Sequence, residues 1–149
     1  MNHYSSWWDD TITLYNKYID PVDKKKVTWY RHVISDCFYK HTIEKITVGN
    51  TTIDSNVSIC RIRVSDDFVD KKAWMELTDA ERRSSFTLCA GDIIVADEVD
   101  FEIDEYTSGQ RSSDLIKENK DWPGCFMIET VNINVGGGRG NEHYHVRGT

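Results

Sequence analysis

Three groups of residues along the chain have the chemical types that catalysis or ligand binding uses. The first is a run of six carboxylates within the nine positions from Asp97 to Glu105. Paired carboxylates perform acid–base chemistry when burial separates their pKa values. Here the acids alternate with Val99, Phe101 and Ile103, so a strand would send them to one solvated face. An edge strand whose charges prevent aggregation is therefore the plainer interpretation.

The second group is the glycine-rich stretch 136–140, which reads Gly-Gly-Gly-Arg-Gly. A phosphate-binding loop needs a lysine followed by serine or threonine, and then a helix whose backbone N–H groups meet the phosphate. Asn141 and Glu142 follow instead and lead into a strand-like segment. The stretch is therefore interpreted as a flexible hairpin loop.

The third group is the pair His143 and His145, which share a face if this segment is a strand. Two histidines so placed bind a metal ion only when a third ligand is near. His32 or His41 would have to come from distant segments, so local hydrogen bonding is favoured. We accordingly predict no catalytic, cofactor-binding or metal-binding residue and no enzyme activity. A hydrolase that uses the acidic run with a divalent metal stays open as an alternative.

Apolar alternation and β-branched residues indicate short strands along most of the chain. Segment 65–87 interrupts this rhythm and contains a short helix that Thr78 caps through a capping box. Segment 97–122 interrupts it again, with a second helix that begins near Ser112. The strands are expected at 11–15, 27–39, 43–48, 51–54, 57–64, 86–88, 93–95, 125–135 and 143–146.

This organisation predicts a mainly β fold, a small β-barrel or sandwich with long loops and one or two short helices. We expect an N-terminal arm over 1–10 and a single domain over 11–149, with long loops at 65–87 and 97–122. The consistent apolar faces of the strands give the expected core, which consists of Ile12, Leu14, Trp29, Val33, Ile62, Ile93, Val95 and Ile133.

The composition limits the partners. The chain has 149 residues and a net charge of −7, from 25 acidic and 18 basic side chains. That balance argues against a protein that grips phosphates, although an acidic lumen lets DNA slide past without sticking. The four cysteines, at 37, 60, 89 and 125, are expected to be small buried hydrophobic residues. Neither a membrane span nor a signal peptide is indicated, so we expect no membrane contact and a cytosolic chain.

Three motifs resemble a known family. Residues 11–16, an Asp-Pro turn and residues 29–34 resemble the first hairpin of tailed-bacteriophage head–tail joining proteins. Residues 88–95, a leucine-x-x-Gly-Asp turn followed by a hydrophobic strand, resemble the middle element of those proteins. Residues 128–135, the glycine loop and residues 143–148 resemble their closing element. The chain is also similar to small proteins encoded among phage and prophage structural genes of gut Firmicutes.

The resemblance implies a head-closure (stopper) protein of the phage neck. Such proteins form a ring between the portal or adaptor and the tail, close the DNA channel and dock the tail. The chain would assemble in the bacterial cytoplasm and end in the virion, with passing contact to packaged DNA. Aromatic residues are favoured interface anchors, so Tyr4, Trp7 and Trp8 are the candidate interface residues. The candidate channel-facing residues are Asp100, Glu102, Asp104 and Glu105.

Besides the hydrolase, two rival functions remain from the sequence. A tail-terminator or other tail-completion protein would also form a ring. A small binding module for a sugar or peptide would expose the same aromatic residues but stay monomeric.

Overall fold

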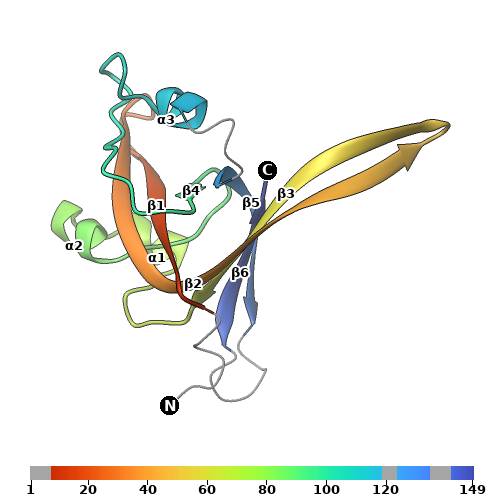
Figure 1. Cartoon of the computed structure of the whole chain (residues 1–149). Coiled ribbons are helices and arrows are strands. Elements are labelled where there is room, and N and C mark those ends of the chain that lie inside the picture. The colour runs from red at the N-terminus through yellow and green to blue at the C-terminus, as the bar shows by residue number, and fades with distance from the viewer. Residues whose placement is uncertain (1–7, 119–123, 135–141) are drawn as a thin grey trace.

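A computed structural model describes residues 8–118, 124–134 and 142–149, and it shows a closed barrel from which one long hairpin projects (Figure 1). The predicted mainly β fold is confirmed, and the barrel is the correct choice between barrel and sandwich. The six strands are β1 (Asp10–Ile19), β2 (Val27–Val48), β3 (Thr51–Arg63), β4 (Ile93–Val95), β5 (Cys125–Asn134) and β6 (His143–Gly148). Three short helices accompany them, α1 (Lys71–Met75), α2 (Asp79–Ser84) and α3 (Ser112–Glu118).

The strands follow the order β1-β2-β3-β6-β5-β4 around the barrel, and every neighbouring pair is antiparallel. The inner face of β1 carries Ile12 and Leu14, as the alternation predicts. They pack with Ile62, Ile94, Val146 and other apolar side chains to fill the interior. Burial of this continuous cluster supplies the main stabilisation of the barrel.

Strand β2 belongs to two parts of the molecule. Residues 27–37 pair with β1, whereas residues 38–48 pair with β3. Asp36 lies where one partner gives way to the other, and its φ of 57° is in the left-handed region. The sequence predicted separate strands at 27–39 and 43–48, but these are one strand in the structure. The bend near Asp36 lets β2 leave the barrel and continue into the projecting hairpin (Figure 1).

The 65–87 segment packs against the barrel through its aromatic side chains. Phe68 and Phe86 form an isolated parallel bridge, and their rings pack on the barrel core. Helix α1 presents Trp74, which is fully buried against the rings of Tyr18 and Tyr30. The predicted capping box at Thr78 is confirmed and begins α2. The 65–87 segment is therefore packed against the hydrophobic core.

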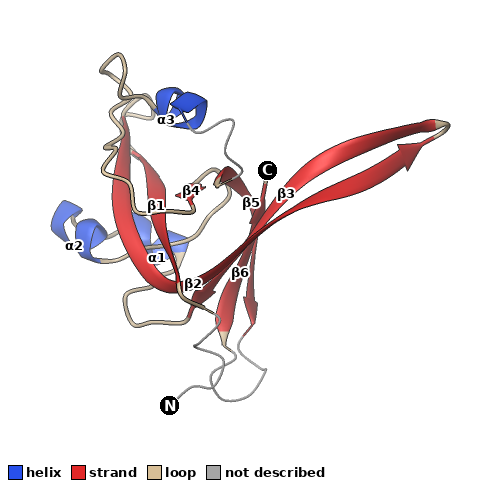
Figure 2. Ribbon diagram, in the orientation of Figure 1, coloured by secondary structure: helices blue, strands red, loops and turns tan. Residues whose placement is uncertain are grey.

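A second apolar cluster lies on the outer face of the barrel. It joins Tyr15 and Trp29 to Ile93, Val95, Ile103 and Leu115. Residues 97–105, called the strap below, and α3 cover this face, and Figure 2 shows the strap as loop between β4 and α3. Strand β1 is consequently buried on both sides, which explains why Thr13 and Tyr15 have no exposed surface.

Two core predictions are wrong. Val33 shares the outer face with Trp29, but the cover over that face ends before it, and its side chain is 40% exposed. Ile133 lies near the end of β5, two residues beyond Val131, which packs against the core, and it is 55% exposed. The other six predicted core residues are buried. Of the cysteines, Cys37 and Cys60 are buried as expected, while Cys89 and Cys125 are partly exposed.

Candidate assembly surfaces

The projecting hairpin is the most unusual surface of the molecule. Residues 40–57, called the arm below, have no strand partner outside the β2–β3 pair in the described structure, because β1 pairs with β2 no further than Cys37 and β6 pairs with β3 only from Ser58 on. Ile46 and Ile53 are cross-strand partners on one face, and Val48 lies on the same face. These three side chains are 47%, 52% and 64% exposed. Apolar groups gathered at such a tip mark an interaction surface.

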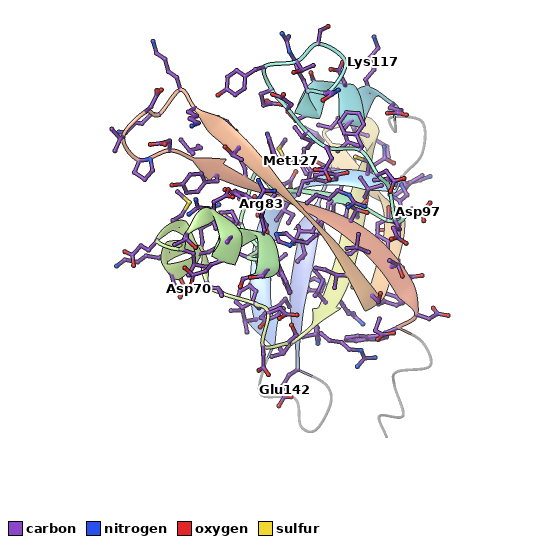
Figure 3. The ribbon with its side chains drawn as sticks, turned by 90° about the vertical axis from the view of Figure 1, so that its left-hand side faces the viewer. Asp70, Arg83, Asp97, Lys117, Met127 and Glu142 are labelled. Carbon is purple, nitrogen blue, oxygen red and sulfur yellow. The ribbon has the colours of Figure 1, made fainter. Side chains whose placement is uncertain are left out.

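A cleft of about 420 Å³ lies between β2 and the 65–87 segment. The helices of that segment, α1 and α2, lie on the side of the barrel opposite the arm (Figure 1). Residues 31–35 of β2 form one wall of the cleft. Ser65, Asp67, Arg83, Ser84 and Phe86 form the other. Figure 3 views the molecule from this side and labels Arg83 where α2 meets the strands. Residues 31–35 pair with β1 along one edge only, and no second strand occupies their other edge in the described ranges.

His32 lies in the wall of this cleft with its ring near Phe86. Burial lowers the pKa of His32 to about 4, so the imidazole is neutral at physiological pH. Its Nε2 atom is buried and has no hydrogen-bond partner within the structure. A neutral ring next to an unpaired strand edge leaves the cleft receptive to a polypeptide partner.

The strap carries the predicted channel-facing residues. Asp100, Glu102 and Asp104 are exposed, whereas Val99, Phe101 and Ile103 turn toward the barrel. The alternation thus separates acids from apolar residues as predicted, but the strap is not an edge strand. Side chains from β1 and β2 hold its backbone instead of a strand ladder. Thr13 Oγ1 donates to Asp97 O at 2.6 Å, and Tyr15 OH donates to Phe101 O at 2.7 Å.

The four predicted carboxylates divide into two pairs. Asp100 is fully exposed and only 3.8 Å from the Arg31 guanidinium, and Glu102 is also exposed. Asp104 accepts from the Tyr106 N–H and the Thr107 hydroxyl, which lowers its pKa. Glu105 is partly buried and accepts the N–H of Ser112 at 2.5 Å, at the start of α3. Asp104 and Glu105 therefore shape the loop, while Asp100 and Glu102 are exposed, with Arg31 beside Asp100.

Of the three predicted interface residues, Tyr4 and Trp7 lie outside the described residues. Trp8 is only 8% exposed in the single chain. Its ring lies 4.5 Å from the Arg63 guanidinium and 5.5 Å from the His143 ring. Trp8 thus has partners within its own barrel, and contact of this segment with a neighbouring subunit stays a prediction.

The histidine pair and the glycine stretch are the remaining candidate groups from the sequence. His143 and His145 lie on β6 with ring centroids 6.5 Å apart, opposite Arg63 and Arg61. Burial, Arg61 and other nearby positive groups lower the pKa of His145, and the same positive charge disfavours a metal ion there. Within the described ranges no three His, Cys, Asp or Glu side chains are placed to hold a metal. The glycine stretch 136–140 lies outside the described residues.

The Gly91-Asp92 turn has a structural role. Gly91 adopts a φ of 98°, which a side chain would disfavour, and the chain then enters β4. The buried Asp92 carboxylate accepts from the Asn16 amide at 2.9 Å and from the backbone N–H groups of Lys17 and Cys89. Burial raises the pKa of Asp92 to about 6 against the effect of these donors. The network ties the 65–92 excursion to β1.

Sequence reasoning missed both the arm as a projection and the cleft. The sequence signal for the arm was present, because two strand patterns flank Gly49-Asn50 and alternate without a complete apolar face. No local pattern shows that β2 changes partners at residues 37–38. The cleft depends on that change and on the return of the chain at Phe86, and local patterns do not report it.

These features define the class: a small closed antiparallel barrel with a strapped outer face and one projecting arm. No helix in the described part of the chain has the length and apolarity to cross a membrane. Residues 7–149 match the family described as "Family of unknown function (DUF6751)", and the chain belongs to this family. No curated protein and no solved structure matches the chain.

Proposed function

We propose that this chain is a structural subunit of the neck of a tailed bacteriophage, where copies form a ring between the portal or adaptor and the tail. The proposal rests on the head–tail joining motifs in the sequence and on the projecting arm. The arm carries the supporting observation, because its tip exposes Ile46, Val48 and Ile53 away from the barrel. Solvent-exposed apolar residues on a two-stranded ribbon are costly for a monomer and useful in an assembly.

The polar groups of the described barrel support an architectural role. The buried Asp92 brace, the Thr13 and Tyr15 contacts to the strap and the Thr78 cap all hold chain segments together. A row of acids on the strap leaves Asp100 and Glu102 exposed. Carboxylates repel the phosphates of DNA, so this row suits the lumen of a ring through which DNA passes.

Two measurements test the proposal. Light scattering coupled to gel filtration, followed by negative-stain imaging, should show the purified protein as a closed ring. A phage lacking the gene should produce heads that lose their DNA and free tails that fail to join them. A protein that stays monomeric at every concentration would contradict the ring. Normal joined virions from the deletion would contradict the neck assignment.

A further inference from the structure

The arm and the cleft of the same chain each present a strand edge without a pairing partner. In the arm, the outer edges of both strands have no partner over 40–48 and 51–57 within the described structure. In the cleft, residues 31–35 present the unpaired edge of β2. Unpaired strand edges in the same protein are templates for pairing between chains.

The two surfaces cannot meet within one molecule. The arm leaves the barrel on the side opposite α1 and α2, and α2 supplies Arg83 and Ser84 to the wall of the cleft (Figure 1). A second copy can supply what the first lacks at each surface. Such a contact joins different surfaces of the two copies, so it repeats around a closed ring when the rotation between subunits permits closure.

Charge favours a second copy as the occupant of the cleft. The net charge of the chain is −7, and most approaches between two copies bring like charges together. The sequence of the arm is an exception, because residues 40–57 contain two lysines and two acidic residues. The cleft is another exception, since its charged groups have partners of opposite sign. Arg31 lies 3.8 Å from Asp100 and Arg83 lies 3.0 Å from Asp79, and Asp67 also lines the cleft. These two surfaces therefore approach each other without the repulsion of the acidic strap.

The apolar side chains are consistent with the same contact. Val33 is 40% exposed at the cleft, whereas Phe86 in the opposite wall is already buried in the barrel core. The arm offers Ile46 and Ile53 on one face beside Val48. A strand added next to β2 gains main-chain hydrogen bonds, and its apolar side chains can cover Val33.

We propose that the arm of one copy adds as a strand to the free β2 edge in the cleft of the next copy. This inference rests on the proposed ring and assigns the contact that builds it. The arm variant combines Ile46→Asp with Ile53→Asp, and the cleft variant is Ser84→Trp, which fills the cleft from an exposed position. Val33→Glu is a second cleft variant in case Ser84→Trp disturbs α2. Matched controls are Val22→Asp in the β1–β2 turn and Ser113→Trp in α3, both at exposed positions.

Light scattering gives the mass of each protein, and thermal unfolding confirms its fold. The arm variant and the cleft variants should each be folded monomers, while both controls form wild-type rings. An equimolar mixture of arm and cleft variants should give a species of two chains and nothing larger, because it contains one intact arm for one intact cleft.

The outcomes separate this contact from the ring itself. Rings in both single variants would overturn the arm–cleft contact and leave the proposed ring intact. A mixture that stays monomeric would also overturn the contact, since complementary surfaces would then not meet. A wild-type protein that remains monomeric would overturn both proposals.

Discussion

The strap is rich in charge but buries its apolar side chains, whereas the arm has few charges and exposes its apolar side chains. The strap has six acids in nine residues, yet its apolar side chains lie against the outer face of the barrel. The arm has only four charged residues between 40 and 57, yet Ile43, Ile46, Val48 and Ile53 are exposed. Alternation alone therefore does not bury a side chain, because a second surface must receive it. The barrel supplies that surface to the strap, and no part of the described chain supplies it to the arm.

The largest loss of stability is expected from truncating a side chain on the barrel face that the strap covers. Ile93 is buried next to Ile103, so Ile93→Ala should lower the free energy of unfolding by about 2–5 kcal/mol. The same change at Ile53 in the arm should alter it by less than about 0.5 kcal/mol in the monomer. Urea denaturation of the two variants at low protein concentration measures both values. Equal losses would mean that the arm is buried within its own chain.

Acid should act on the barrel through His32. Its pKa is about 4 in the folded state because burial disfavours the charged ring, whereas the unfolded chain has an ordinary histidine pKa near 6.5. Above pH 6.5 both states are neutral and no stability is lost. As the pH falls toward 4 the unfolded state takes up the proton first, which costs up to about 3 kcal/mol of stability.

The variant His32→Gln stays uncharged at every pH and should lose this part of the acid sensitivity. Urea midpoints of wild type and variant at pH 7 and pH 4.5 measure the difference. Parallel pH profiles would show that the ring protonates in the folded cleft. Because Asp92 has a raised pKa and contributes the opposite slope between about pH 4 and 6, the comparison is made between the two proteins and not on wild type alone.

The parts of the fold that follow from short-range signals were predicted from the sequence. The strand at 11–15, the Thr78 capping box and the division of the strap into acidic and apolar faces are each set by neighbouring residues. The burial of Thr13 and Tyr15 was not predictable in this way, because the strap that covers them follows about eighty residues later. The predicted burial of Val33 was wrong for the converse reason. Its position in the pattern resembles that of Trp29, but the strap and α3 cover only Trp29.

The candidate surfaces show the same division. The acids of the strap were found because charge is visible in a sequence. The cleft was not found, because it is defined by a strand edge that lacks a neighbour, and a missing neighbour has no local signature. The arm lies between these cases. The strands on either side of Gly49-Asn50 were predicted, but the length of the arm depends on where β1 and β6 stop pairing.

The smallest effect on stability is expected where the strap faces solvent. Asp100→Asn with Glu102→Gln removes the two carboxylates that make no backbone contact in the described structure, so the free energy of unfolding should change by less than about 0.5 kcal/mol. Changing Asp104 and Glu105 as well would disturb their contacts to Tyr106, Thr107 and Ser112 and confuse loop stability with charge. The double variant is therefore the cleaner probe of a channel role. If Asp100 and Glu102 line a DNA channel, the variant should fold and form rings while filled heads retain or eject DNA at an altered rate. Wild-type packaging, retention and infectivity would instead place these carboxylates on the outside of the ring, where their charge serves solubility.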